Sequence, residues 1–365
     1  MNKKFQKLIK NPGIFFRDYF MKKYPIINTE QKFTEDDELA VNIVKKRMHE
    51  IENKIPDFLN FDVDIVYTWV NDQDPNWIKK RKSYSLNEQC LNDSTDIARF
   101  ENHNELYYSI LSVKKFLPWV RNIYIVTDNQ KPDWLEDGSN IFIVDHKDII
   151  DKQYLPTFNS HVIEAHLHKI NGLSEHFIYF NDDVLVAKPL SKEHFFRKNG
   201  VASIFSSKKS LKAMYERGVI TATLLASRNS NEILKKQFGI KLDLPLVHTY
   251  VPLKKSIFKK YWENNFDVIQ GFLPNKYRAK NDVNMATFLV PWSMYLEGKS
   301  IITSEICYYF NIRSPHALQQ YKKLLRMKNM QQWPHSICVN DFKVNEDSSQ
   351  NFSQNLEKFL NDYYL

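Results

Sequence analysis

The nine residues from Phe177 to Leu185 constrain the fold of this chain more than any other segment. Four mostly apolar residues come first, and a run of this kind, rich in aromatic and β-branched side chains, is typical of a buried strand. Asn181, Asp182 and Asp183 follow directly, and apolar residues then resume. Two adjacent carboxylates at the end of a buried strand repel each other and lose solvation unless a positive charge lies beside them.

A divalent cation is the usual source of that charge, and oxygen ligands favour Mg²⁺ or Mn²⁺ over Zn²⁺. In an open α/β sheet, ligands bind just beyond the carboxyl ends of the strands. Asn-Asp-Asp is also the composition of an ordinary turn, which is the commoner explanation for the tripeptide on its own. The apolar residues on both sides weigh against a turn tip. The motif therefore indicates a metal–diphosphate site at a strand end.

Strand and helix patterns alternate along the first half of the chain. Strands are predicted at residues 63–70, 122–127, 141–145 and 177–180, with helices at 104–116 and 160–170 between them. This alternation predicts an α/β fold with a mainly parallel, Rossmann-like sheet and helical insertions. Polar residues end each strand, as the edge of a nucleotide-binding sheet requires.

Composition changes along the chain suggest several segments. We expect a basic amphipathic leader at 1–25, a helical lead-in at 26–60, a catalytic domain at 61–345 with a helical insertion at about 190–300, and a C-terminal tail at 346–365 that forms a loosely attached helix. The leader interleaves Lys and Arg with aromatic side chains, which suits the surface of an anionic membrane. A helix docked on the body of the protein is the alternative.

Bulk composition narrows the class of protein. The 365 residues are 43% hydrophobic and 26% charged, and no apolar run reaches the roughly 18 residues of a membrane-spanning helix. Three widely spaced cysteines indicate neither a disulfide framework nor a zinc pattern, which points to a reducing cytoplasm. The net charge of +8 favours polyanionic partners such as nucleic acid, anionic lipid or phosphorylated substrates. Strand-end carboxylates would oppose a nucleic acid, so none is expected as a partner.

Three separated segments each have polar side chains, able to hold phosphate or metal, that are expected to follow a strand. They are Asp64, Thr68, Asn71 and Asp74; Asn181 to Asp183; and Asn340 with Asp341. A lone histidine among apolar residues, such as His248, is usually structural, yet imidazole is also a natural general base for a sugar hydroxyl. Arg278 is suited to hold phosphate oxygens bidentately, with a salt bridge to Asp282 as the alternative.

Four blocks of the sequence together resemble the conserved blocks of the Stealth family of sugar-1-phosphate transferases. They are residues 65–75, a long block from Glu105 to Asp183, a third containing His248, Arg278, Asn281 and Asp282, and a fourth at 336–341. The resemblance covers residues 62–341 in the right order, and the first 25 residues are similar to the leader of bacterial capsule members. Phe342 departs from the acidic or small residue that often follows the fourth block, and Tyr107 and Tyr108 stand where Arg is frequent.

The resemblance implies an activity. Family members transfer a hexose 1-phosphate from a UDP-sugar to a hydroxyl of an oligo- or polysaccharide acceptor, release UMP and use Mg²⁺ or Mn²⁺. N-acetylglucosamine 1-phosphate is the expected transferred group. The expected fold is a GT-A-like sheet that binds a nucleotide sugar. The implied setting is bacterial capsule or surface polysaccharide synthesis with other capsule-synthesis enzymes, in the cytoplasm or at the inner face of the cytoplasmic membrane.

Each candidate residue has an expected role in this scheme. Asp183, Asn340 and Asp341 hold the metal. His248, Asp182 and Arg278 form the catalytic group, in which His248 takes the proton of the acceptor and Arg278 stabilises charge on the phosphate. The donor is contacted by Thr68, Asn71, Asp74, Asn159, Ser160, Asn281 and Asp282. The alternative is a conventional glycosyltransferase, which releases UDP. A basic protein that only binds membranes or nucleic acid leaves the strand-end acids unexplained.

Overall fold

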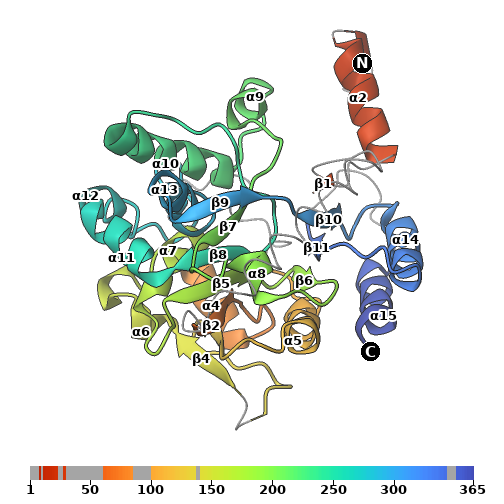
Figure 1. Cartoon of the computed structure of the whole chain (residues 1–365), viewed down its shortest axis with the longest axis horizontal. Helices are drawn as coiled ribbons and strands as arrows, with labels where there is room; N and C mark the ends of the chain where they lie inside the picture. Colours follow the sequence, from red (N-terminus) through yellow and green to blue (C-terminus); the bar gives the residue numbers. More distant parts are fainter. Residues whose placement is uncertain are drawn as a thin grey trace.

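A five-stranded sheet lies at the centre of the computed structural model, which describes residues 8–9, 11–23, 28–29, 61–84, 100–136, 140–342 and 351–365 (Figure 1). Across the sheet the strands are β4 (Ile141–Asp145), β3 (Ile123–Thr127), β2 (Val63–Thr68), β5 (His176–Asn181) and β8 (Val251–Lys254). Neighbours are parallel from β4 to β5, and β8 runs antiparallel to β5. The predicted α/β fold with a mainly parallel sheet is confirmed.

Burial explains why these strands were visible in the sequence. β2 and β5 are buried at every residue but the last, and β3 is buried throughout. A parallel strand covered on both faces reads as a continuous apolar run. β4 lies at the edge and has a mixed burial pattern. The helices and 3₁₀ turns that connect and flank these strands are α4 (Pro75–Tyr84), α5 (Glu105–Phe116), α6 (His146–Ile149), η3 (Lys152–Tyr154), α7 (Ser160–Glu164) and η4 (Leu167–Lys169).

The helix predicted at 160–170 is wrong in its length. α7 ends after one turn, and the chain continues into the 3₁₀ helix η4. Backbone bonds from Lys169 to His166 and from Ile170 to Leu167 span three residues instead of four. The tighter winding changes the direction of the segment before it enters β5.

A second sheet lies beside the first, and the chain passes into its strand β6 (Val184–Val186) directly after β5. The strands of this second sheet are, in order, β1 (Asn28–Thr29), β10 (Ile306–Asn311), β11 (Ser336–Asn340) and β6. β10 and β11 are parallel, and β6 is antiparallel to β11. The Asn181–Asp183 segment therefore joins the two sheets. The rest of the predicted lead-in at 26–60 lies outside the described residues.

The expected helical insertion at about 190–300 contains strands as well as helices. β7 (Ala202–Phe205) pairs with β9 (Ser300–Thr303) in a third, two-stranded sheet. The helices are α8 (Lys192–Phe195), α9 (Leu211–Glu216), α10 (Ala222–Phe238), α11 (Lys255–Asn264), α12 (Phe266–Ile269), the π-helix η5 (Met285–Leu289) and α13 (Val290–Leu296). In Figure 1, α10 to α13 gather on one side of the central sheet. Because β8 belongs to the central sheet, this region is part of the main core.

The predicted helix in the C-terminal tail is present, but the expectation that it is loosely attached is wrong. α15 (Phe352–Tyr364) lies against α14 (Ala317–Asn329) and α5. Its side chains at 356, 359, 360, 363 and 364 are buried, which is the spacing of one helix face. Tyr108 donates a hydrogen bond to Asn361 at 2.8 Å. Apolar burial on one face thus fixes a segment whose polar residues suggested weak attachment.

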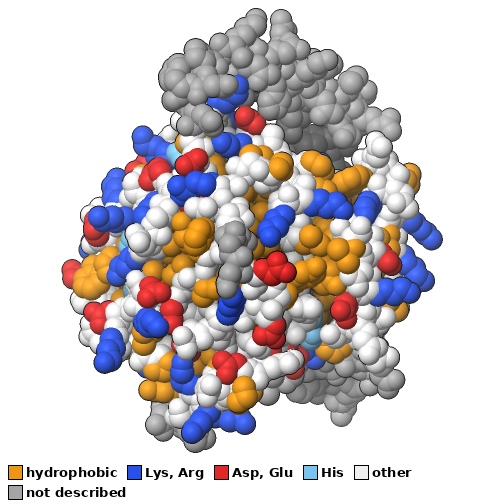
Figure 2. Space-filling view, turned by 90° about the horizontal axis from the view of Figure 1, so that it is seen from below, with side chains coloured by type: hydrophobic (Ala, Val, Ile, Leu, Met, Phe, Trp, Pro, Cys, Tyr) orange, Lys and Arg blue, Asp and Glu red, His pale blue; other side chains and the backbone are white. Residues whose placement is uncertain are grey.

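Part of the basic leader forms the helix α2 (Pro12–Lys23), which projects away from the sheets (Figure 1). Ile14, Phe16, Tyr19 and Phe20 are exposed along it. No helix in the described part of the chain combines the length and the apolar character needed to cross a bilayer. On the face shown in Figure 2, Lys and Arg side chains are interspersed with Asp and Glu, so the net positive charge is not gathered into one patch there.

Candidate active site

The order of strands reverses between β2 and β5. The chain passes from β2 to β3 and β4 at one edge, then returns to place β5 on the other side of β2. Thr68 and Asn181 are the last residues of these two strands and face each other in register. Ligands of open α/β sheets bind outside the carboxyl ends of the strands at such a reversal. The candidate site is therefore centred on the ends of β2 and β5.

Asn181, Asp182 and Asp183 form a tight connection from β5 to β6. The segment is thus both a turn and a strand-end acidic motif. The backbone N–H of Val339 donates to the Asp183 carbonyl at 3.0 Å, and Asn340 Nδ2 donates to Asp183 Oδ2 at 3.1 Å. The structure therefore brings together Asp183 and Asn340, which are 157 residues apart.

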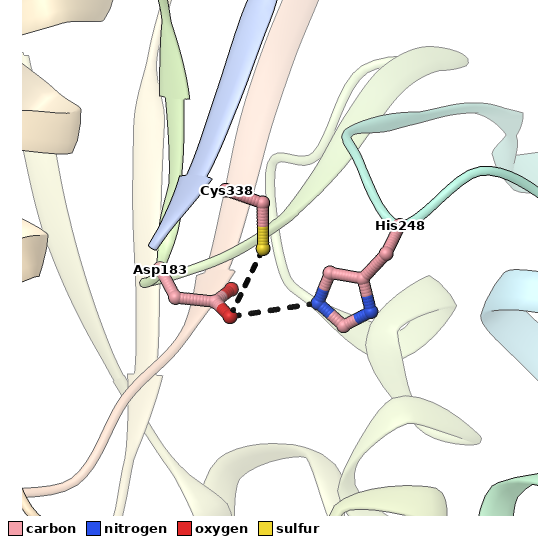
Figure 3. Close-up of side chains that lie close together, drawn as sticks. All are labelled: Asp183, His248 and Cys338. Atoms are coloured by element: carbon pink, nitrogen blue, oxygen red, sulfur yellow. Dashed lines mark hydrogen bonds and ion pairs between the residues drawn. The ribbon is translucent and has the colours of Figure 1, made fainter. Parts of the chain in front are cut away.

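His248 lies beside Asp183 (Figure 3). It precedes β8, and because β8 is antiparallel to β5, it enters the sheet near the carboxyl end of β5. His248 Nε2 is 3.5 Å from Asp183 Oδ2, and Cys338 Sγ donates to the same oxygen at 3.3 Å. The His248 side chain is 41% exposed, whereas Asp183 is 17% exposed. An imidazole that solvent and substrate can reach thus contacts a carboxylate held inside the protein.

Three carboxyl groups interact electrostatically at this site. Burial, then the charges of Asp183 and Glu105, raise the pKa of Asp182 well above its usual value. Burial raises the pKa of Glu105 to about 7, and the charge of Asp183 adds to this effect. Burial also acts to raise the pKa of Asp183, but the neighbouring His248, Cys338 and Asn340 outweigh it and lower that pKa. Asp183 is therefore the carboxyl group of the three that stays ionised most readily.

The residues present fit a divalent cation. Asp183 Oδ1 is buried and has no hydrogen-bond partner within the described part of the chain. An unpartnered buried carboxylate oxygen is costly, and a cation bound to it would remove that cost and the repulsion from Asp182 and Glu105. Burial, with the charge of Asp183, raises the pKa of Cys338 well above its usual value, so Cys338 is a neutral thiol and a poor ligand. The remaining carboxylate and amide oxygens suit Mg²⁺ or Mn²⁺.

Thr68 connects to this group through a chain of hydrogen bonds. Tyr179 donates to Asn181 Oδ1 at 2.8 Å, and the Thr68 hydroxyl lies 3.0 Å from the Tyr179 hydroxyl. Asn71 and Asp74 lie in the loop that follows β2, where Gln130 Nε2 donates to Asp74 Oδ2 at 3.1 Å. Asp74 also accepts from backbone N–H groups at the start of α4. The predicted donor contacts of these residues stay predictions.

Arg278 and Ser160 form a second polar group. Arg278 donates to Ser160 Oγ through Nε at 3.0 Å and through a terminal nitrogen at 2.7 Å. Behind them, Asp282 is fully buried and accepts from Asn159 and from the ring of His161, both at 2.9 Å.

Asn159 is also fully buried, and Asn281 is bound to Gly271 and Asn275. The structure therefore places Asn159, Asn281 and Asp282 in a supporting frame, with their proposed donor contacts untested. Arg278 and Ser160 are half-buried, which makes them more accessible than Asn159 and Asp282, and Asn281 is exposed.

Asp341 is not placed with Asp183. Its carboxylate is gripped by Arg313, whose terminal nitrogen is 2.8 Å from Oδ2, and by His103 Nε2 at 2.9 Å. Burial acts to raise the pKa of Asp341, but Arg313 and His103 outweigh it and lower that pKa. Arg313 also contacts Glu101. Asp341 thus belongs to a neighbouring ionic cluster, and Asn340 is the member of the predicted pair that reaches Asp183.

Sequence reasoning did not assign roles to Glu105, Tyr179, Asn181 or Arg313. One signal was available for Glu105: it opens the long block, Glu105 to Asp183, that resembles the Stealth family. An acid in the first turn of a helix is otherwise ordinary, because it interacts favourably with the helix dipole. Arg313 gave no local signal, because its partners Asp341 and Glu101 are 28 and 212 residues away.

Comparisons with known proteins agree with the residue pattern. Residues 61–89 match the family description "Stealth protein CR1, conserved region 1", and residues 99–204 match "Stealth protein CR2, conserved region 2". A capsular polysaccharide phosphotransferase of Actinobacillus suis is 55% identical over 100% of this chain and 99% of its own length. The proteins named capsular polysaccharide phosphotransferase fcs1 of Haemophilus influenzae and LcbA of Neisseria meningitidis are 54% and 52% identical, each over 99% of this chain and at least 99% of their own.

Solved structures are more distant. The galactosyltransferase LgtC is 12% identical with a TM-score of 0.39, over 82% of this chain and 96% of its own. Because a TM-score of 0.39 is low, the fold assignment rests on the order of the strands. Identity above one half over the whole length of named relatives is decisive for the family. The chain belongs to the Stealth family of capsular polysaccharide phosphotransferases.

Proposed function

We propose that this enzyme transfers a hexose 1-phosphate, with N-acetylglucosamine 1-phosphate the first choice, from a UDP-sugar to a saccharide hydroxyl and releases UMP. The observation that carries the proposal is the 3.5 Å contact between His248 and Asp183 at the strand-order reversal. It sets a general base beside the strongest candidate metal ligand. The names of the relatives support a phosphotransferase that acts in capsule synthesis.

In the proposed reaction the acceptor hydroxyl attacks the β-phosphorus of the donor, and the bond to the UMP oxygen breaks. His248 accepts the proton of that hydroxyl. A proton on His248 Nε2 facing Asp183 leaves the lone pair on Nδ1, and the carboxylate stabilises the imidazolium that forms. The exposure of the ring leaves room for an acceptor to approach.

Transfer of a phosphoryl group depends mainly on positioning and charge neutralisation. Asp183 and Asn340 would hold Mg²⁺ or Mn²⁺, with Asp182 close by, and the ion would neutralise charge on the diphosphate. Arg278, positioned by Ser160, would contact the oxygens of the transferred phosphate. Thr68, Asn71 and Asp74 lie at and beyond the end of β2, where a nucleotide would bind.

The proposal also covers the acceptor, the location of the enzyme and its contact with the membrane. Relatives named for capsule synthesis support an oligo- or polysaccharide acceptor and a bacterial cytoplasmic location. The exposed aromatic side chains of α2 and the basic residues of the leader support contact with the anionic inner face of the membrane.

The deciding experiment incubates the purified enzyme, Mg²⁺ and an oligosaccharide acceptor with a panel of UDP-sugars and separates the nucleotide products. UMP together with a phosphodiester in the saccharide product supports the proposal. UDP with a plain glycoside would show a conventional glycosyltransferase. His248→Ala, with His316→Ala as the matched control outside the site, tests whether the product depends on the proposed base.

A further inference from the structure

A second cluster of metal-ligating side chains lies outside the candidate active site. Glu305 is buried between β9 and β10, and its side chain is completely shielded from solvent. His194 of α8 and His335, the residue before β11, both direct ring nitrogens at it. One ligand atom from each of the three residues lies within 4.8 Å of the others. The cluster therefore joins three segments that are far apart in the sequence.

The two oxygens of Glu305 have different partners. Oε1 accepts from the Tyr250 hydroxyl at 3.0 Å and from the Ser336 hydroxyl at 2.7 Å. Those two donors satisfy its two lone pairs. Oε2 lies 2.9 Å from His194 Nε2 and 3.3 Å from His335 Nδ1. The ring nitrogens thus converge on a single oxygen.

His335 Nδ1 has two competing partners. It lies 3.1 Å from the backbone N–H of Ile306 and 3.3 Å from Glu305 Oε2. A ring nitrogen carries either a proton or a lone pair in its plane, not both. A proton on Nδ1 serves Glu305 and a lone pair serves Ile306, so this nitrogen cannot satisfy both partners. A cation held between Nδ1 and Oε2 would take the lone pair in place of the Ile306 N–H and would bind the carboxylate at the same time.

We propose that His194, Glu305 and His335 form a second metal site, which takes a divalent transition-metal ion, Zn²⁺ above others. Two imidazoles and one carboxylate are a common ligand set for zinc. Metal–ligand bonds of about 2.0–2.1 Å in tetrahedral geometry separate neighbouring ligand atoms by roughly 3.3 Å. The contacts of 2.9 and 3.3 Å are close to that spacing. His194 and His335 are 16% and 15% exposed, so water can supply a fourth ligand.

The position of this site indicates a structural role. Thr249 donates to Ser336 at 2.8 Å, and both Ser336 and Tyr250 donate to Glu305. Thr249 and Tyr250 directly follow His248. An ion held by Glu305 would therefore fix the segment that presents His248 to Asp183, without touching the substrate.

The test uses the full chain carrying His248→Ala, which removes the imidazole of the active-site cluster. After treatment with a chelator, this chain is titrated with Zn²⁺, and bound metal is counted by elemental analysis. One zinc per chain is expected, with a rise in melting temperature of a few degrees. Adding His335→Ala should weaken zinc binding by at least about tenfold, a conservative bound from outer-shell mutations. Cys338→Ser, added to His248→Ala instead, is the matched control and should leave zinc binding in place.

Absence of zinc binding, or binding that is unaffected by His335→Ala, would overturn the proposal. Where His335→Ala does not fold, Co²⁺ absorption of the His248→Ala chain, with and without His103→Ala, decides between the clusters, because Glu101, His103 and Asp341 also offer nitrogen and oxygen ligands. A tetrahedral spectrum with only nitrogen and oxygen ligands that His103→Ala leaves unchanged supports the site. A thiolate charge-transfer band, or a spectrum that His103→Ala removes, refutes it. Because the readout is metal binding, failure here is distinct from failure of the proposed sugar-phosphate transfer.

Discussion

Replacing Glu105 by Gln should make the metal-free protein more stable at alkaline pH. Glu105 is buried at the start of α5, and burial raises its pKa from 4.5 to about 7. Between these two values the folded protein keeps a proton that the unfolded chain has lost. Stability is therefore lost as pH rises through this window. A Gln side chain does not ionise and avoids that loss.

The structure sets the size of the effect. A difference of about 2.5 pH units between the folded and unfolded pKa corresponds to about 3 kcal/mol, at roughly 1.36 kcal/mol per unit. The backbone N–H of His103 donates to Glu105 at 2.6 Å, and the carbonyl oxygen of Gln can accept the same bond. Removing the charge of Glu105 also lowers the raised pKa of Asp182, which acts in the same direction.

Urea unfolding in the presence of EDTA, at pH 5 and at pH 8, measures the difference in unfolding free energy between Glu105→Gln and the parent. Glu105→Gln should gain stability over the parent between pH 5 and pH 8, approaching the full 3 kcal/mol as the pH rises. Glu216→Gln, at an exposed position of α9, is the control and should follow the parent at both values. An equal difference from the parent at both pH values, or a less stable variant at pH 8, would refute the reasoning.

Three further predictions address the site and its support. His248→Ala should lower turnover by about 100-fold or more with an unchanged melting temperature; near-normal turnover in steady-state assays would remove His248 as the base. Asp183→Asn keeps the shape of the side chain but should abolish the response of activity to added Mg²⁺, and an unaltered Mg²⁺ titration would reject it as a ligand. Arg121→Ala leaves Asp64, which is fully buried, without its guanidinium partner. Because Arg121 is 36% exposed, we expect a loss of unfolding free energy near the lower end of the range for broken buried pairs, about 3 kcal/mol. Urea unfolding measures this loss, and a value below about 1 kcal/mol would contradict the pairing of Arg121 with Asp64.

Local patterns in the sequence were enough to predict four of the five strands of the central sheet, whereas β8 was missed within the expected helical insertion. β2, β3 and β5 are buried on both faces, so each is a nearly continuous apolar run that can be recognised without knowing its neighbours. The acidic motif at Asn181–Asp183 was visible for the same reason, because it interrupts such a run. The blocks around His248 and Asn340 were found by their resemblance to the Stealth family.

Other features depended on partners far along the chain. Asp64 was grouped with the strand-end residues, but it lies near the start of β2 and is bound by Arg121. Asp341 was expected on the metal, and the structure pairs its carboxylate with Arg313. α15 was expected to be loose, and α5 and α14 bury one of its faces. In each case the local sequence was compatible with both outcomes.

Local residue patterns settled the α/β class, four of the five central strands, the acidic turn and the family. The folded chain alone reveals that β5 returns beside β2, that Asn340 rather than Asp341 reaches Asp183, and that Glu105 joins the acidic group. The two kinds of feature differ in the range of the interactions that cause them. Strand and turn preferences act over a few residues, whereas the ionisation and ligand capacity of a carboxylate depend on whichever side chains the fold brings within a few ångströms of it.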